Sequence, residues 1–240
     1  MRFFLVIIMI AAANDVRAGD KVPGLEIEEI YKNVYLHKSY QRIDGFGLVS
    51  SNGLVVVDNE KAFVIDTPWS GEDTRILVGW IREQGFDPVG SISTHSHEDR
   101  AAGIRWLNSQ SIPTYASNLT NEILKREKKE LASNTFAGPE AILFDGNLEA
   151  FYAGAGHTTD NIVVWLPDSK ILYGGCLVRS LGARSLGYTG EAVVNEWPAT
   201  MEKLLARYSE AEMVVPGHGK IGDISLLEHT VNLAESATSP

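Results

Sequence analysis

The stretch that decides the fold is Val89–Arg100, which reads VGSISTHSHEDR. An apolar, strand-like run, Val89–Ile92, leads directly into His95 and His97. In an extended chain, residues two apart point to the same side, so both imidazoles leave the strand together, and Asp99 joins them if the chain stays extended. Imidazole nitrogen and carboxylate oxygen are both zinc ligands. A lone His-x-His pair can also be an incidental surface repeat, so the rest of the chain must decide between the two.

Three further candidate ligands lie downstream of this stretch. His157 stands in the sequence GHTTD, the only cysteine, Cys176, follows two glycines, and His218 stands in PGHG. Each of these residues, like His95, comes after an apolar run, which predicts ligands held at the ends of strands. Six ligands suit two zinc ions with three protein ligands each. A structural zinc site closes its tetrahedron with protein ligands, whereas a catalytic one leaves a position open, so the set favours catalysis.

The composition limits the class of protein. The chain has 240 residues, a hydrophobic fraction of 44% and a formal net charge of -10. That size and hydrophobic content predict one globular domain. No basic stripe appears, and phosphate binding needs clustered Lys and Arg, so nucleic acid is excluded as a partner.

The N-terminus predicts export. Arg2 precedes the apolar run 3–13, which is too short to span a bilayer, and Val16-Arg17-Ala18 suits a cleavage site. We therefore expect a signal peptide over 1–18, a single mature domain over 19–240, periplasmic localisation and no membrane anchor. The alternative is a buried first helix. In an exported protein a single cysteine has no disulfide partner; Cys176 is then either a buried inert thiol or a metal ligand, and its neighbours favour the ligand.

Hydrophobic periodicity predicts an α/β protein. Short apolar runs separated by turn residues predict strands, and amphipathic stretches predict helices, the first of them with Ser70 as its N-cap. The predicted strands are 25–30, 34–37, 47–49, 54–57, 62–65, 89–94, 148–152, 162–166, 170–173 and 212–215, and the predicted helices are 70–84, 99–108, 118–129, 196–208 and 224–235. Because the order repeats, we expect two mixed sheets packed face to face with helices outside, divided near 137–145.

These motifs resemble one known family. The string Thr94–Asp99 resembles the zinc motif of the metallo-β-lactamase superfamily, and the stretches 65–69, 156–158, 174–178 and 216–219 are similar to those of its subclass B1. The resemblance implies an αββα sandwich with the active site in a shallow groove along one edge of the sheets. Superfamily members that act on thioesters or phosphodiesters usually carry a second histidine where this chain has Arg100, and an aspartate where it has Cys176. Both differences favour a lactamase.

The resemblance also implies the metal ligands and the reaction. It assigns His95, His97 and His157 to a first zinc and Asp99, Cys176 and His218 to a second, which makes two Zn²⁺ per chain. Zinc-bound hydroxide, oriented by Asp99, would open the β-lactam ring of penicillins, cephalosporins and carbapenems and so confer antibiotic resistance. Arg100 would lie behind the second zinc near the thiolate. Asp66 would orient ligands by hydrogen bonds, although a plain turn residue before Pro68 is a credible alternative.

Substrate contacts are implied in the same way. The family commonly has lysine three residues after the metal cysteine, and Arg179 there keeps the positive charge that would pair with the substrate carboxylate, in a setting we expect to be open to water. Ser185 stands where many relatives have an asparagine that helps the oxyanion, which weakens the case for a side-chain donor. The loop 39–46, with Tyr40 and Phe46, matches a mobile flap, but for Phe46 we favour packing within a strand.

Two other functions remain open on the sequence alone. One is another zinc hydrolase of the same fold, acting on a thioester or a lactone. The other is a zinc-binding or storage protein without catalysis. As partners we expect only small-molecule β-lactam substrates, and we expect a monomer.

Overall fold

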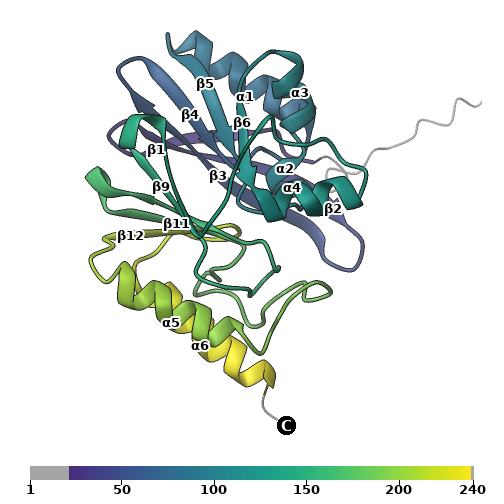
Figure 1. Ribbon diagram of the computed structural model, residues 1–240, viewed down its shortest axis with the longest axis vertical. Helices are drawn as coiled ribbons and strands as arrows, with labels where there is room; N and C mark the ends of the chain where they lie inside the picture. The colour runs from purple at the N-terminus through teal and green to yellow at the C-terminus, as the bar shows by residue number, and fades with distance from the viewer. Residues whose placement is uncertain (1–21, 239–240) are drawn as a thin grey trace, which may run out of the picture.

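The computed structural model describes residues 22–238, so the predicted signal peptide over 1–18 lies outside the described residues. Two mixed sheets form the centre of the molecule (Figure 1). The seven-stranded sheet has the order β1-β2-β3-β4-β5-β6-β7, and the five-stranded sheet has the order β12-β11-β10-β9-β8. The sheets divide between Phe136 and Glu140, where the sequence predicts the boundary.

The first sheet begins as an antiparallel meander and continues with parallel strands from β4 onward. Its strands are β1 (Glu26–Tyr31), β2 (Val34–Ile43), β3 (Gly47–Asp58), β4 (Lys61–Ile65), β5 (Asp87–Ile92), β6 (Thr114–Ser117) and β7 (Asn134–Phe136).

The second sheet is antiparallel except for the parallel pair β11 and β12. Its strands are β8 (Glu140–Leu143), β9 (Leu148–Phe151), β10 (Val163–Leu166), β11 (Ile171–Gly175) and β12 (Met213–Pro216).

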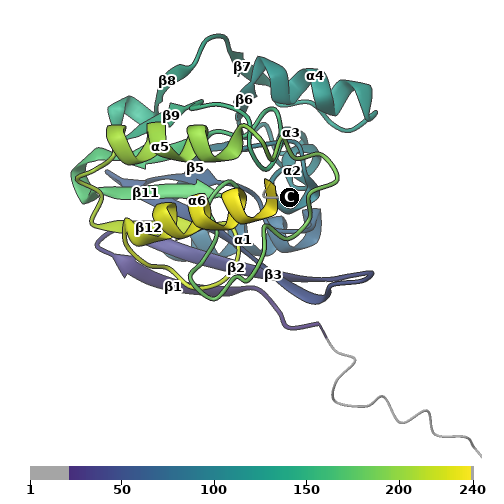
Figure 2. The same cartoon turned by 90° about the horizontal axis from the view of Figure 1, so that it is seen from below.

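The helices are α1 (Gly71–Glu83), α2 (Glu98–Ala101), α3 (Ile104–Ser109), α4 (Asn118–Arg126), α5 (Trp197–Arg207) and α6 (Ser225–Thr238), with short 3-10 turns η1 (Phe144–Gly146) and η2 (Pro167–Ser169). Helices α5 and α6 lie side by side on the outer face of the five-stranded sheet (Figures 1 and 2). Helix α1 begins as predicted, because the Ser70 hydroxyl accepts a hydrogen bond from the amide of Asp73. None of the helices in the described part of the chain is long and apolar enough to cross a membrane.

Three apolar layers hold the four structural layers together. Between the sheets, residues such as Leu54 and Ile65 pack against Val164 and Tyr173. The outer face of the first sheet packs on α1 through Leu77, and the outer face of the second packs on α5 and α6. The predicted αββα sandwich is confirmed.

Local predictions were wrong where polar residues serve distant partners. Strand β3 runs unbroken through Ser51-Asn52-Gly53, the turn-type residues that separate the predicted strands 47–49 and 54–57. The Asn52 amide donates to the carbonyls of Pro216 and Gly219, and the Ser51 hydroxyl donates to the carbonyl of Asp99, so these polar side chains stabilise tertiary contacts and do not end the strand.

The helix predicted over 99–108 is divided into α2 and α3. Gly103 lies at the break, where a Cβ would come within 2.4 Å of Thr74 Oγ1, and its amide donates to the Thr67 hydroxyl. The short strands β6, β7 and β8 carried too weak a pattern to be predicted.

Candidate metal centre

The loop between β5 and α2 holds the first group of ligands rigidly. The Asp66 carboxylate accepts hydrogen bonds from the amide and hydroxyl of Thr94, at 2.7 and 2.8 Å. The buried Asp160 accepts one from the amide of Ser96 at 3.0 Å. These contacts fix the backbone on both sides of His95, so the position of its imidazole is set by the fold.

Three imidazoles converge at this loop. His97 Nδ1 lies 3.2 Å from His95 Nε2 and 3.2 Å from His157 Nε2. Ligands about 2.0–2.1 Å from a tetrahedral zinc are about 3.3 Å apart, so this spacing fits the donor set of one ion. His157 is in the loop after β9, six residues beyond the end of the strand at Phe151, and so does not directly follow a strand as predicted.

A second group lies beside the first. Cys176 Sγ is 3.3 Å from Asp99 Oδ2 and 3.2 Å from His218 Nε2, and Asp99 Oδ2 is 3.2 Å from His218 Nε2. Cys176 directly follows β11 and His218 comes two residues after β12, so two neighbouring parallel strands bring them together. His95 is within 4.8 Å of the Asp99 and Cys176 ligand atoms, so the two groups adjoin.

The electrostatics of the two groups suit a cation. Burial, followed by the charge of neighbouring histidines, lowers the pKa of both His95 and His157 well below the ordinary value, so both are neutral and able to ligate. Burial alone would also lower the pKa of His218, but Cys176 and Asp99 outweigh it and raise that pKa to about 10. In the absence of a metal, therefore, the second group attracts a proton to the place that a metal ion would take.

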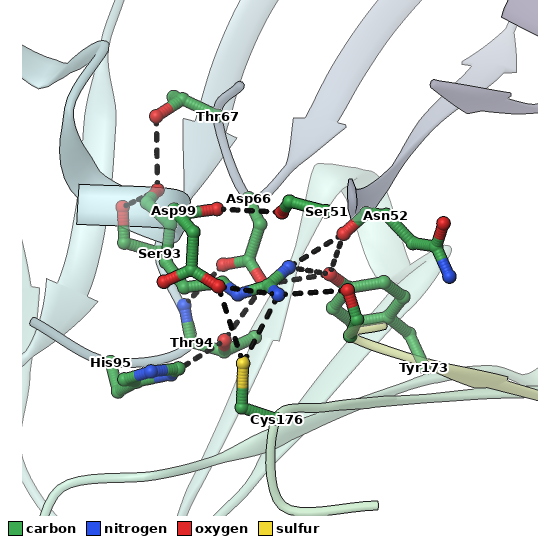
Figure 3. Close-up of polar contacts among 12 residues, drawn as sticks. Ser51, Asn52, Asp66, Thr67, Ser93, Thr94, His95, Asp99, Tyr173 and Cys176 are labelled. Atoms are coloured by element: carbon green, nitrogen blue, oxygen red, sulfur yellow. Dashed lines mark hydrogen bonds and ion pairs between the residues drawn. The ribbon is translucent and has the colours of Figure 1, made fainter. Parts of the chain in front are cut away.

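Arg100 lies behind the second group, as the resemblance implies. Its guanidinium is fully buried, and Nη2 lies 2.8 Å from Asp99 Oδ2 and 3.1 Å from Cys176 Sγ. Nη1 donates to the Asn52 carbonyl and to the Tyr173 hydroxyl at 2.6 and 2.7 Å. Figure 3 shows the side chains of Asp66, Asp99, Tyr173 and Cys176 lying around one common centre. Although burial opposes the charge of Asp99, Arg100 holds the pKa of that carboxyl well below its usual range.

Asp66 connects the two ligand groups through its contacts with Thr94 and Arg100. Besides Thr94 it contacts the Tyr173 hydroxyl at 2.8 Å and Arg100 Nη1 at 3.4 Å, and it has no exposed surface. Burial raises the pKa of Asp66 to about 6, although Arg100 and the hydrogen bonds from Thr94 and Tyr173 oppose the shift. A residue with this many buried partners is more than a turn residue before Pro68.

Five of the six candidate ligands line a groove of about 410 Å³, namely His97, Asp99, His157, Cys176 and His218. Its lining also includes the apolar side chains of Ile43, Phe46, Val49 and Trp69, and the polar side chains of Lys129, Arg179, Tyr188 and Glu191. Phe46 is 56% exposed at the tip of the β2–β3 hairpin, so the prediction that it packs within a strand was wrong.

The predicted substrate residues differ in their placement. Arg179 lies in the groove beside Gly187, but its side chain is largely buried and Nε has no hydrogen-bond partner among the described residues, so the setting is less open to water than predicted. Burial lowers the pKa of Arg179. Ser185 is exposed, accepts a hydrogen bond from the amide of Gly187, and is not among the residues that line the groove.

Sequence reasoning missed Glu191. Its Oε2 lies 2.5 Å from His97 Nε2, which leaves Nδ1 of that ring facing the other two imidazoles. The loop that carries Glu191 is fastened next to His157, because the amide of Val193 donates to the carbonyl of Gly156 at 2.8 Å. No motif signals this contact in the sequence, because it depends on how the loop before α5 packs.

Two mixed sheets between helices, with paired ligand groups at their edge, define a class of metal-binding sandwich proteins, and comparisons with known proteins narrow it. The sequence model of the Metallo-beta-lactamase superfamily matches residues 46–218. A metallo-beta-lactamase type 2 from Pseudomonas aeruginosa is 46% identical over 213 residues, which cover 89% of this chain and 85% of the relative. One from Bacillus cereus is 38% identical over 212 residues, covering 87% and 82%.

Solved structures agree with these relatives. The crystal structure of DIM-1 metallo-beta-lactamase exposed to ceftazidime superposes with a TM-score of 0.90 at 60% identity, covering 91% of this chain and 100% of that one. FIM-1 from Pseudomonas aeruginosa, crystallised in a mono-zinc form, gives 0.87 at 32% identity, covering 93% and 100%. The chain belongs to the metallo-β-lactamase superfamily, in subclass B1.

Proposed function

We propose that this protein is a zinc-dependent hydrolase that opens the β-lactam ring of penicillins, cephalosporins and carbapenems and thereby confers antibiotic resistance. The observation that carries the proposal is the pair of ligand groups at a groove that is also lined by a largely buried cation, Arg179. This arrangement offers a metal site and an anion site within one substrate-sized volume.

The fit of the donor set favours two zinc ions. His95, His97 and His157 would hold one, and Asp99, Cys176 and His218 would hold the other. Zinc, when bound, acts as a Lewis acid that lowers the pKa of water to about 7 and polarises a carbonyl. Since the relative FIM-1 was crystallised with one zinc, the stoichiometry needs its own measurement. Metal analysis after dialysis against zinc should give two ions per chain; saturation at one would remove the second site from the proposal.

The residues around the ligands have separate tasks. Asp99, which Arg100 keeps ionised, can accept a hydrogen bond from a water molecule in the groove and orient it toward the lactam carbonyl. The Arg179 guanidinium would pair with the substrate carboxylate. The apolar side chains of Phe46 and Trp69, which line the groove, would pack on substituents of varied shape. Recognition would then rest on the lactam amide and carboxylate, which predicts a broad substrate range.

Location and assembly follow the same proposal. The segment 1–18 would direct the chain to the periplasm and be removed, which mass spectrometry of periplasmic protein can test. We expect a monomer without a membrane anchor and with no nucleic-acid partner, in keeping with the net charge of -10.

Hydrolysis of imipenem by the purified protein tests the proposal. We expect turnover that EDTA abolishes and that added zinc restores, with aztreonam spared. Turnover of a thioester or lactone without imipenem turnover would favour another zinc hydrolase of this fold. Zinc binding without any turnover would favour a storage protein.

A further inference from the structure

His37 lies outside the groove, yet its ring reaches toward the residue that connects the two ligand groups. It belongs to β2, is 1% exposed, and is in register with Gly53 of β3. On the far side of β3, Leu54 pairs with Ile65 of β4, so the position opposite Gly53 belongs to Asp66. His37 Nε2 lies 3.0 Å from the carbonyl oxygen of Asp66. The imidazole therefore reaches from β2 across β3 to the backbone of Asp66.

Gly53 makes this crossing possible. A Cβ at this position would lie 2.3 Å from both Cε1 and Nε2 of His37 and 2.8 Å from the carbonyl oxygen of Ile65. The ring thus occupies the space that any side chain on Gly53 would need. Two strand spacings amount to about 9.5 Å, which an imidazole and one hydrogen bond can bridge only if nothing stands between. His37 and Gly53 therefore act together, because only a glycine at position 53 leaves room for the ring of His37.

The hydrogen bond from His37 holds Asp66 in an unfavourable backbone conformation. Asp66 has a φ of 59°, in the left-handed region that non-glycine residues rarely adopt. Its amide donates to the carbonyl of Ile92 at 2.8 Å, and its own carbonyl accepts from His37. Such a conformation persists only when several surrounding contacts together stabilise it. His37 supplies one of these contacts from β2, across β3.

The conformation of Asp66 matters for both groups. With this φ its carboxylate points to Thr94, whose backbone leads directly into His95, and to Arg100, whose Nη2 contacts Asp99 and Cys176. If the turn at Asp66 relaxed, the loop that carries His95 and the cation behind Cys176 would both lose a partner.

We propose that His37, a neutral Nε2–H donor lying across Gly53, is a positioning residue that locks Asp66 in its left-handed turn and thereby pre-organises both metal groups. This inference rests on the proposed function only in that the groups bind zinc. Since a carbonyl can only accept, Nε2 carries the proton, and because the ring is only 1% exposed it stays neutral. The other nitrogen, Nδ1, is buried without a partner among the described residues, which agrees with a ring that has a single task.

The tautomer is tested on the unmodified, zinc-loaded protein. Nitrogen-15 NMR of the histidine rings should show His37 neutral with its proton on Nε2 at pH 7. A proton on Nδ1, or a charged ring, would overturn the proposal without any variant having to fold.

Zinc release is tested with three variants, each titrated with a competing chelator. His37→Leu should weaken zinc binding by roughly tenfold or more, as the loss of partners that orient metal ligands does. His37→Gln, which keeps a neutral donor of similar reach, should recover most of that loss. Val34→Ala is the matched control, because Val34 is a buried residue of the same strand that pairs with Val56, away from Asp66.

We expect Val34→Ala to lower thermal stability and leave zinc affinity unchanged. A His37→Leu protein that loses stability but holds zinc like the wild type would show that His37 only fills the core. Failure of the wild-type protein to hydrolyse any β-lactam would refute the proposed function but leave the zinc and tautomer results to judge His37.

Discussion

Arg100 Nη2 lies 3.1 Å from Cys176 Sγ, and the guanidinium is completely buried. The neighbouring Asp99, 2.8 Å from the same nitrogen, offsets the cost of burying this charge. The sequence shows Arg100 only as the residue after the motif aspartate. The fold makes it the link between Asp66, Asp99 and Cys176.

Removing this charge should destabilise the fold. Arg100→Met leaves two buried carboxylates without their cation, and breaking a buried pair costs about 3–5 kcal/mol. The matched control is Arg105→Met, because Arg105 is an exposed residue that pairs with Glu130 at 3.5 Å, a contact worth about 0–1 kcal/mol. Urea unfolding of both variants measures the difference. Equal stability of the two would show that Arg100 is not needed to balance the buried charges.

Cys176→Ala should empty the second group and leave the first intact. The thiolate is the softest of the six ligands, and losing even an indirect partner of a metal costs about 10- to 100-fold, so activity should fall at least about tenfold. Metal analysis should give one zinc per chain. Two bound zinc ions with full activity would make Cys176 a core residue only.

Glu191→Ala should weaken the first group. The carboxylate fixes which nitrogen of His97 faces its neighbours, and because Glu191 is 48% exposed we expect the low end of the effect, about tenfold in zinc affinity. Glu191→Gln keeps an acceptor oxygen and should lose less. Competition with a chelator measures the zinc affinity of both variants. Identical zinc affinities for Glu191→Ala, Glu191→Gln and the wild type would show that Glu191 does not orient His97.

Acid should act on the fold through His37. Burial lowers the pKa of His37 to about 3 from its ordinary 6.5, so the stability that this ring contributes is present above pH 6.5 and is lost as the pH falls toward 3. Asp66, whose pKa is raised to about 6, acts in the opposite direction: its contribution is complete below pH 3.8 and is lost as the pH rises through 6. The two effects largely cancel in the wild type.

A comparison with His37→Gln isolates the histidine. The stability advantage of the wild type over this variant should shrink by about 1.4 kcal/mol for each pH unit below 6.5, since Asp66 titrates in both proteins. Denaturant unfolding of the pair from pH 7 to 5 checks this. An advantage that stays constant with pH would mean that His37 is not buried as a neutral ring.

The sequence singled out the six ligand candidates because each is local to a motif, and the structure brings them into two adjoining groups. His95 and His97 are fixed by one loop, and the order of strands with helices predicted the sandwich and its division near 137–145. The contacts of Glu191 and Asn52 could not be predicted, because they join segments far apart in the chain. Ser51-Asn52-Gly53 was misassigned for a related reason: turn-type residues stood there to accommodate His37 and to hold the loop of His218, which only the packed structure reveals.

Arg179 provides the test closest to the chemistry. It lines the groove with Cys176 and His218, and no carboxylate is paired with its guanidinium among the ion pairs of the described residues. A largely buried cation without a negatively charged partner is costly. The carboxylate of a bound substrate would supply that negative charge. A charged hydrogen bond contributes about 1.5–3 kcal/mol, or about 10- to 150-fold in affinity. Because the side chain is largely buried, we expect the middle of that range.

Arg179→Ala should therefore raise KM for imipenem and benzylpenicillin and leave the zinc content unchanged. Arg179→Lys should recover much of the loss if the contact is a single one, and little if both guanidinium nitrogens engage the carboxylate. Arg184→Ala is the matched control, since Arg184 is an exposed arginine of the same loop that does not line the groove. If kcat/KM of Arg179→Ala stays within about twofold of wild type, too little transition-state stabilisation is lost for an anchor.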